Sequence, residues 1–422
     1  MSSRFLPPQP DLEHLKNDAK GLLKTHKKGD SSVCSVFRRL KRFAGATDSE
    51  ILSAEIALTE AQFVLAMDYG FASWDKLRQA VLDCKPLGGS EAPPQPGALR
   101  LPDPPAPKPG VNRFPSAYYL ALSYCGIACD YNTMAGDSGM AFILQADSLH
   151  TAWGAKRKEL DIGFWPVDQW GSLLRLDFLG RVYGRTFQAM LGHEGEYAQD
   201  GAQHFRKYFQ AAVVQSLQQG RPAMALEHDM YVVTGFDGGN PPLLGQVSCS
   251  DVAQIKRLGR YPWSVIVLGE TIAAIERTQA DAEAVDFAIR LHKDQFGPNL
   301  PGKFSGKGAF ELWTRLLRDD ELCGPHFYHA NVVGHMKRAR ASVPPYLRQM
   351  ALRHGEAAAG KLRAAAGIYE EVVAVLAPAD TSKEAFTTPA GREALAKIVD
   401  AVAGFEAKAV GELELAVKAM HV

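Results

Sequence analysis

Residues 114–142 read FPSAYYLALSYCGIACDYNTMAGDSGMAF, and the interpretation of the whole chain starts from this stretch. Its first half predicts one apolar helix, because Tyr118, Leu122 and Cys125 recur at helical spacing. Gly126 is expected to end that helix. One broad face of the helix is apolar, so we expect the helix to be mostly buried.

The start of this helix and the segment after it carry their own signals. Ser116 follows a proline and is the predicted N-cap, because a serine hydroxyl can accept a hydrogen bond from a first-turn N–H group. After the helix, the run 135–139 needs permissive backbone at two glycines. It therefore predicts a tight loop that returns to the core at Phe142.

The composition is that of a globular protein with room for two or three domains in its 422 residues. Hydrophobic residues make up 46% of the chain and charged residues 22%, which is ordinary. The 47 Lys and Arg residues equal the 47 Asp and Glu residues, so no net charge favours nucleic acid or an anionic membrane as a partner. No apolar run reaches about 18 residues, which argues against a membrane span.

The cysteines and the N-terminus indicate a cellular compartment. The six cysteines are scattered and none forms a Cys-x-x-Cys pair, which favours reduced thiols in a cytosol. The first residues are polar and charged, without the apolar core of a signal peptide. We therefore expect a cytoplasmic protein, and no motif indicates a cofactor.

Hydrophobic periodicity divides the chain into four regions. Residues 1–85 read as a small helical module, and residues 86–112 are dense in proline and glycine, as in an extended linker. Residues 113–272 combine the apolar helix with short apolar runs, and residues 273–422 are nearly all helical in pattern.

The order of elements in the central region predicts the fold class. A strand is expected at 141–146, and the later apolar runs are expected to pair as antiparallel strands, at 221–227, 230–237, 243–248 and 263–269. A helix followed by antiparallel strands is the order of an α+β fold. The predicted fold is thus α+β, with helical regions flanking a central domain that contains an antiparallel sheet.

The N-terminal region resembles a known helical segment. Its sequence segments DLEHLKNDAKGLLKTHKKGD and LTEAQFVLAMDYGFASWDKLRQAV are similar to the segment found ahead of ankyrin repeats and other modules in many bacterial proteins. The resemblance covers about 75 residues and implies an attached helical module. The TPLHxA phrase of an ankyrin repeat does not follow.

The central region resembles the papain-like C39-type peptidase fold. The sequence segments that carry this resemblance are, in order, LALSYCGIACDYNTMAGDSGMAF, GRPAMALEHDMYVVTGFD, LLGQVS and PWSVIVLGE. Within that superfamily the region looks closest to the N-terminal domain of the butirosin biosynthesis protein H group. GKGAFELWTRLLRDD and AAAGIYEEVVAVL look like the helical tail that accompanies this domain, so the resemblance spans residues 113–376.

The resemblance implies a cysteine nucleophile at the start of the central helix, with a histidine base on a strand and an Asp or Asn that orients it. A helix N-terminus favours a thiolate, which is why the nucleophile stands there. Counting back from Gly126 places it at 113–116, where no cysteine occurs. Ser116 offers a hydroxyl there, although an N-cap role explains it as well. Cys125 and Cys129 follow at the opposite end of the helix, where the dipole disfavours a thiolate and a packing role is favoured.

The position of the base is displaced as well. The resemblance puts the histidine six residues before Gly235, where Asp229 stands, with His228 next to it. A one-residue shift turns a strand side chain to the other face, so His228 is favoured as a strand-end histidine. Asp237 matches the acid at the strand end of the family, but an aspartate before two glycines also fits a turn.

Aromatic residues beside the central helix suggest either a ligand cleft or ordinary core. Tyr118 and Tyr119 lie on the helix, and Trp165 and Trp170 belong to an aromatic stretch that follows. Aromatic side chains of this kind line apolar pockets, but they fill cores more often.

Two further clusters argue against other classes of site. His326, His329 and His335 fall within ten residues, but their spacing is not one that zinc sites use, so surface or helix-end histidines are expected and no metal is predicted. Residues 337–342, KRARAS, are the densest basic cluster, which in a neutral chain favours the solvated end of a helix over a nucleic-acid site.

Three functions remain open from the sequence. The first is a papain-like domain that has lost its nucleophile and binds a peptide, an acyl chain or a carrier protein in the former cleft. The second is an active acyl or peptidyl transferase, or a peptidase, that uses Ser116, or Cys125 with His228. The third is a scaffold whose helical regions recruit partners.

Overall fold

The structure is a computed structural model. It describes residues 12–30, 33–43, 45–68, 73–83, 98–102, 112–147, 161–163, 175–191, 194–227, 229–250, 254–293, 303–319, 323 and 326–421. The described residues up to 83 belong to one compact unit, and those from 98 onward belong to a second. Each unit is described by itself.

The first unit is helical, as the sequence predicts. Phe37, Ile51 and Leu65 are buried in its core. Its second helix has only four residues, Cys34–Phe37, and a short helix capped by Thr47 follows it. The helices are α1 (Leu12–Lys27), α2 (Cys34–Phe37), the 3-10 helix η2 (Lys41–Phe43), α3 (Asp48–Ser53), α4 (Leu58–Asp68) and α5 (Trp74–Asp83).

The second unit contains two antiparallel sheets. In the larger sheet the described strands are ordered β4-β9-β5-β6-β7-β8, and β1 pairs with β6. The smaller sheet has the order β10-β2-β3. The strands are β1 (Leu99–Arg100), β2 (Gln145–Asp147), β3 (Asp161–Gly163), β4 (Arg185–Leu191), β5 (Ala223–Leu226), β6 (Met230–Phe236), β7 (Leu243–Val247), β8 (Lys256–Arg257), β9 (Ser264–Thr271) and β10 (Lys303–Ser305).

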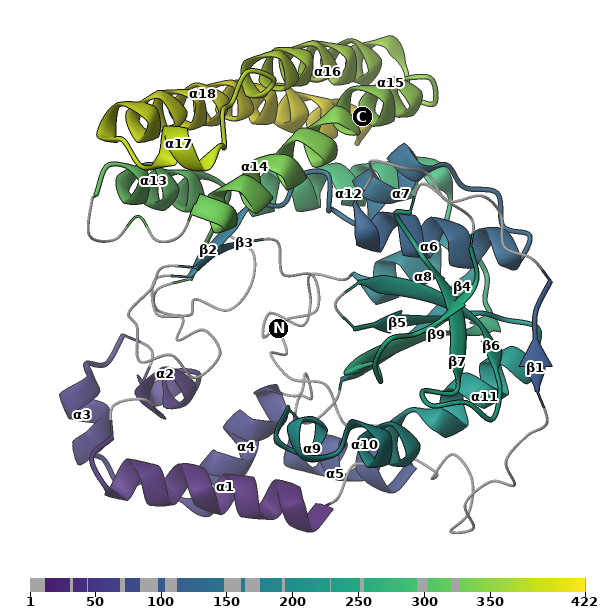
Figure 1. The fold of residues 1–422 in the computed structure, drawn as a ribbon. Coiled ribbons are helices and arrows are strands. Elements are labelled where there is room, and N and C mark those ends of the chain that lie inside the picture. Colours follow the sequence, from purple (N-terminus) through teal and green to yellow (C-terminus); the bar gives the residue numbers. More distant parts are fainter. Residues whose placement is uncertain are drawn as a thin grey trace. The chain divides into compact units, whose positions relative to one another are not determined.

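Helices cover both faces of the larger sheet (Figure 1). The first of them, α6 (Arg113–Tyr124), packs against β5 and β6. On the other face, α10 (Gly201–Tyr208) and α11 (Gln210–Gln218) form an apolar core with the strands through Phe205, Phe209 and Val213. The predicted apolar helix and the predicted strands therefore do pack together, as an α+β fold requires.

The strands predicted from the apolar runs after residue 220 are confirmed as β5, β6, β7 and β9. The strand expected at 141–146 is shorter and later, since it covers only Gln145–Asp147. Part of the expected linker belongs to the sheet, because β1 pairs with β6. Leu101, just after β1, lies in the apolar core that the sheet forms with α10 and α11. A short apolar patch, ALRL at 98–101, is enough to place these residues in the sheet despite the prolines around them.

The central helix departs from the prediction at its amino end only. Asn112, not Ser116, is the N-cap residue, and its side chain caps no first-turn N–H group. Ser116 lies inside the first turn, so its predicted capping role is wrong. At the other end Cys125 is the C-cap and Gly126 has φ of 70°, with Ile127 N–H donating to Leu122 C=O at 3.0 Å. The predicted end at Gly126 is confirmed, because glycine adopts this left-handed conformation readily.

The segment after α6 is a helix followed by a turn, so the predicted loop is confirmed only from Gly139, which has φ of 79°, to the buried Phe142. It forms α7 (Tyr131–Asp137), capped by the Asp130 carboxylate, which accepts from Asn132 N–H at 2.9 Å. Gly136 lies inside α7, where an added Cβ would be 2.4 Å from the ring of Tyr346. The glycine therefore serves close packing between helices and not a turn.

Two short helices border the larger sheet. α8 (Leu176–Tyr183) precedes β4, and α9 (Glu194–Gln199) precedes α10. Residues 201–218 form two helices, because the backbone breaks at Phe209 between α10 and α11.

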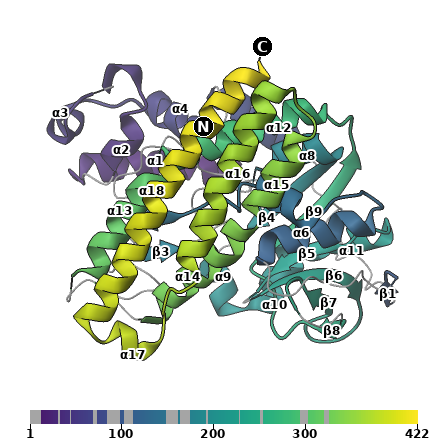
Figure 2. The same ribbon diagram turned by 90° about the horizontal axis from the view of Figure 1, so that it is seen from above.

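The C-terminal helices belong to the same compact unit as the sheets. Their bounds are α12 (Arg277–His292), α13 (Gly306–Leu317), α14 (His326–Ala341), α15 (Val343–Ala351), α16 (Glu356–Leu376), α17 (Lys383–Phe386) and α18 (Pro389–Met420). Figure 2 shows α16 and α18 side by side along their length. The last helix starts at Pro389, behind the cap Thr388. The boundary expected at 272 does not separate compact units, because α12 packs against both α7 and α18.

The described part of the chain contains no helix that is both long and apolar enough to cross a membrane.

Candidate functional site

The hydroxyl of Ser116 forms a hydrogen bond in the interior of the protein. The residue is fully buried, and its hydroxyl donates to the backbone carbonyl of Ser248, just after β7. The hydroxyl of Ser248 in turn donates to the carbonyl of Arg113 at 2.8 Å. These two bonds tie the first turn of α6 to the end of β7. A hydroxyl whose proton is given to a carbonyl has no base to activate it.

Cys125 lies at the carboxyl end of α6, half-buried. Burial raises the pKa of its thiol, and the opposing influence of Arg185 and Arg221 is smaller. The helix dipole also disfavours an anion at this end. Cys125 is therefore a neutral thiol at neutral pH.

The other predicted catalytic residues are not brought to one place. Asp229 precedes β6 and pairs with Arg113 at 3.1 Å, whereas Asp237 follows β6 at its other end. Asp237 forms a two-pronged ion pair with Arg257, at 2.6 and 2.7 Å. Its carboxylate also accepts from Gly239 N–H at 2.8 Å, as a turn-forming aspartate does. His228 lies outside the described residues.

The two described aromatic residues of the predicted cleft differ in exposure. Tyr118 is 1% exposed, and its ring meets that of Phe187 edge to face. Burial raises the pKa of the Tyr118 phenol, whose oxygen has no hydrogen-bond partner in the part of the chain that the structure describes. Tyr119 is half-buried. Trp165 and Trp170 lie outside the described residues, so the predicted aromatic lining is described only in part.

A different cysteine stands near the start of α6. Cys249 follows Ser248 directly, and Ser248 is hydrogen-bonded to Arg113 at the first position of the helix. Its thiol is half-buried, and burial raises its pKa, while Arg113 and Arg338 act to lower it. Sequence reasoning missed Cys249 because QVSCS reads only as a strand end, and its approach to the helix depends on the pairing of β6 with β7.

Polar groups from two other helices meet Cys249 at this end of α6. The Arg338 side chain, from α14, donates through Nε to Asn112 Oδ1 at 3.3 Å. The phenol of Tyr131, at the start of α7, accepts from Asn112 N–H at 2.8 Å. The start of α6 thus gathers a thiol, two arginines, an amide and a phenol from segments far apart in the sequence.

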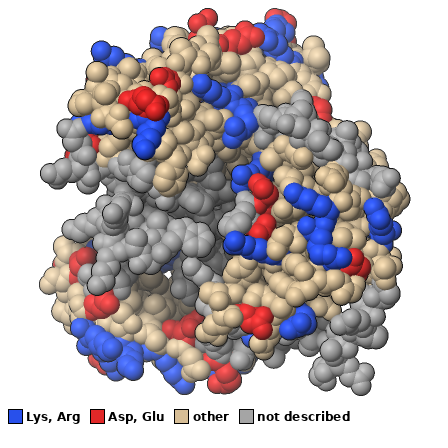
Figure 3. All heavy atoms as spheres, viewed as in Figure 1, with Lys and Arg blue, Asp and Glu red and all other residues tan. Residues whose placement is uncertain are grey.

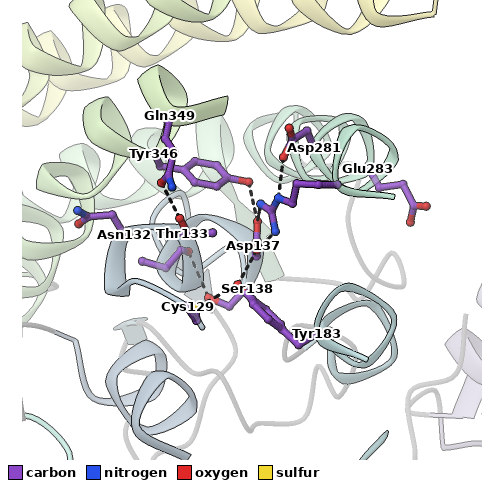
Figure 4. A network of polar contacts seen from close by, with 12 residues as sticks. Cys129, Asn132, Thr133, Asp137, Ser138, Tyr183, Asp281, Glu283, Tyr346 and Gln349 are labelled. Atoms are coloured by element: carbon purple, nitrogen blue, oxygen red, sulfur yellow. Dashed lines mark hydrogen bonds and ion pairs between the residues drawn. The ribbon is translucent and has the colours of Figure 1, made fainter. Parts of the chain in front are cut away.

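A second polar cluster surrounds Asp137 at the end of α7 (Figure 4). Its fully buried carboxylate accepts two hydrogen bonds from Arg277, at 2.6 and 2.7 Å. The phenols of Tyr183 and Tyr346 donate to the same carboxylate at 2.7 and 3.0 Å. Burial alone would lower the pKa of Arg277, but the bonds to Asp137 and the carboxylate charge raise it above its ordinary value.

The charge network continues into α12 and α15. Asp281 is fully buried and accepts two hydrogen bonds from Arg353, both at 2.8 Å, and one from Arg277 at 3.1 Å. Its carboxylate also lies 3.1 Å from Nε2 of His354. Two buried carboxylates are thereby compensated by arginines from neighbouring helices, which is the condition for burying charge at all.

Arg175 adds a cation that contacts this network through the carbonyl of Asp137. Its guanidinium is stacked 3.7 Å from the ring centre of Phe178 and 4.1 Å from that of Phe287, and it donates to the carbonyl of Asp137 at 2.8 Å. Burial lowers the pKa of Arg175 to about 10. Its backbone has φ of 48°, a strained value for a residue with a side chain.

Cys129 touches this cluster but is not activated by it. Its thiol lies 3.3 Å from the hydroxyl of Tyr183, which donates its own proton to Asp137. Burial raises the pKa of Cys129 to about 12. The Asp137 network therefore positions α7, α8, α12 and α15 against one another and generates no thiolate.

The clustered histidines are partly buried, which corrects the expectation of surface histidines. His329 is 4% exposed; its Nδ1 accepts from the indole N–H of Trp313 at 3.0 Å, and its Nε2 contacts the carbonyl of Cys323. Burial lowers the pKa values of His329 and His335. Among the described residues no group of three or more His, Cys, Asp or Glu side chains could hold a metal ion.

The basic segment 337–342 lies at the end of α14, as expected, but only part of it is solvated, at Arg338. Arg340 is fully buried and paired with Glu406. Lys337 donates to the carbonyls of Ala377 and Ala379, at 3.0 and 3.3 Å, after the end of α16. On the face shown in Figure 3, basic side chains are interspersed with acidic ones.

Neither a protein-family model nor a curated protein sequence matches this chain.

Proposed function

We propose that this chain is a non-catalytic papain-like protein that binds a peptide, an acyl chain or a carrier protein beside α6. The observation that carries the proposal is the state of the first turn of α6, where such enzymes need a nucleophile. The turn holds Arg113, Phe114, Pro115 and Ser116, and the only hydroxyl there is buried and bonded to the Ser248 carbonyl.

The pKa values of the thiols support the same proposal. A cysteine nucleophile reacts as the thiolate, which requires a lowered pKa. Burial raises the pKa of each thiol for which a shift is known, namely Cys34, Cys125, Cys129, Cys249 and Cys323. Such thiols are expected to be poor nucleophiles at neutral pH.

One observation favours the enzymatic alternative, an acyl or peptidyl transferase. Cys249 stands near the amino end of α6, close to Arg113 and Arg338, which is an environment that favours a thiolate if the site is rehydrated. The experiment must therefore include Cys249 as well as the residues predicted from the sequence.

Hexanoyl-N-acetylcysteamine, a small acyl thioester, separates the two functions. The purified chain is incubated with the thioester at pH 7.5, thioester loss is followed by chromatography, and intact mass is recorded during the incubation. We expect thioester loss at the buffer rate and no hexanoyl adduct. In parallel, iodoacetamide should label the native cysteines slowly, with no site much faster than the others.

Variants assign any reactivity that does appear. A hexanoyl adduct that disappears in Cys249→Ala, Cys125→Ala or Ser116→Ala would make the chain an enzyme and overturn the proposal. Cys34→Ala is the control, because Cys34 is buried in the first unit, far in sequence from α6.

A further inference from the structure

The start of α6 has the features of a site for an oxyanion. The helix has twelve residues, and the side chain of its N-cap residue, Asn112, caps no N–H group. In the first turn of α6, Pro115 has no N–H group and Ser116 N–H donates to the Asn112 carbonyl, so the donors nearest the helix start are the N–H groups of Arg113 and Phe114. Together with the helix dipole, N–H groups at this position favour an anion. A helix start alone is too common to define a site, so the side chains around it decide the question.

The charges near this helix start leave one arginine without a carboxylate. Arg113 pairs with Asp229 at 3.1 Å, which largely balances those two charges. Arg338 is exposed and forms no ion pair with a described carboxylate; its Nε donates to Asn112 instead. The guanidinium keeps further donors in a planar fork that suits a phosphate or a carboxylate.

Asn112 supplies the second, independent observation. The residue is 2% exposed, and its side-chain nitrogen Nδ2 has no hydrogen-bond partner among the described residues. Its oxygen accepts from Arg338 Nε at 3.3 Å, so the amide and that guanidinium lie side by side at the start of α6. A buried donor without an acceptor costs about 1–3 kcal/mol, and an anion placed there would supply the missing acceptor.

We propose that Asn112, Arg338 and the first turn of α6 bind an oxyanion, the phosphate or carboxylate group of the ligand. The inference rests on the proposed binding function, since a peptide ends in a carboxylate and a carrier-linked acyl group can be held through a phosphate.

The test titrates the full chain with sodium phosphate or sodium acetate at constant ionic strength, with chloride as the reference salt. Calorimetry gives the affinity, and iodoacetamide labelling of Cys249, followed by peptide mass spectrometry, gives a local readout. We expect phosphate, acetate or both to bind and to slow Cys249 labelling. The stronger of the two identifies the ligand group as a phosphate or a carboxylate.

Three variants make the result specific. Arg338→Met removes the guanidinium and should weaken anion binding about tenfold or more, the loss of one charge-assisted hydrogen bond. Asn112→Asp keeps a good N-cap residue but puts a negative charge in the site, so the fold should persist while binding is lost. Arg348→Met is the matched control, because Arg348 is an exposed arginine paired with Glu370 on the neighbouring helices.

Equal effects of phosphate, acetate and chloride in the native chain would overturn the inference. So would equal affinities in Arg338→Met and Arg348→Met, because the anion would then bind elsewhere. Thioester turnover bears only on the proposed function, and anion affinity bears only on this site, so the two failures are distinguishable.

Discussion

His329 shows at the residue scale how burial sets the behaviour of a titratable side chain. Both of its ring nitrogens have partners, Trp313 and the carbonyl of Cys323, in the interior of the C-terminal helices. Burial lowers its pKa below the ordinary value, so the folded protein holds the ring neutral. Protonation would put a charge where no described carboxylate is bonded to the ring, and it would break the bond from Trp313.

This predicts a loss of stability on mild acidification. An unfolded histidine takes up a proton near pH about 6.5, whereas folded His329 does so only at lower pH. Below pH about 6.5 the unfolded state therefore binds more protons, and the free energy of unfolding falls as the pH falls. Urea unfolding at pH 7.5 and pH 5.5 measures the loss, which should be smaller in His329→Gln.

The control for this pH effect is His421→Gln, a change at an exposed histidine. It should leave the difference between the two pH values as it is in the native chain. If His329→Gln behaves like this control, burial of the imidazole does not govern the effect.

At the element scale, α7 is held by the fit between a glycine and an aromatic ring. Gly136 faces Tyr346 of α15, and an added Cβ would lie 2.4 Å from the ring carbon Cδ1. Tyr346 is fully buried and bonded to Asp137, so it has no room to retreat. Close packing of this kind transmits any added volume into strain.

Gly136→Ala should therefore destabilise the chain although alanine is the better helix former. Overpacking costs about 1–3 kcal/mol, against a gain of about 1 kcal/mol in helix propensity. Gly404→Ala is the matched control, since that glycine is exposed in α18 with nothing within 4 Å of an added Cβ. It should stabilise the chain by about 0.5–1 kcal/mol in urea unfolding. Equal effects of the two changes would contradict the packing argument.

At the scale of the whole molecule, Arg340 joins the central region to the last helix. Its guanidinium binds Glu406 of α18 and donates to the carbonyls of Ala141 and Ile143, at 2.9 and 3.1 Å. Both charged residues are buried. A buried pair is costly to form, but removing one partner leaves the other charge uncompensated.

Arg340→Met should cost about 3–5 kcal/mol in free energy of unfolding. The double change Arg340→Met with Glu406→Leu should recover part of that loss, because no buried charge remains. Arg348→Met, which breaks an exposed pair, should cost about 0–1 kcal/mol. If the double variant is no more stable than Arg340→Met, the uncompensated carboxylate is not the cause.

The division into compact units predicts where the chain can be cut. Residues 95–422 should unfold cooperatively as a separate protein, because the described residues from 98 onward form one unit. Residues 95–272 should not, since they lack α12 and α18 and leave Asp137 without Arg277. Circular dichroism with urea unfolding of both fragments measures this, and a cooperative transition in the shorter one would count against a shared core.

The sequence by itself determined the α+β class, the apolar helix ending at Gly126 and the later strands, because helical and alternating periodicity are local properties. It did not determine that the Ser116 hydroxyl is hydrogen-bonded to a carbonyl or that KRARAS contains a buried arginine. It also missed α7, because a glycine that serves packing between helices looks like a glycine that serves a turn.

Only the tertiary structure decided which polar groups meet. Asn112, Cys249 and Arg338 are far apart in the sequence, and they come together because β7 pairs with β6 and Arg338 of α14 reaches the N-cap residue of α6. Strand pairing and helix crossing are set by contacts distant in sequence, and no periodicity in the chain encodes them. The local pattern therefore fixed the elements, and long-range packing fixed the site.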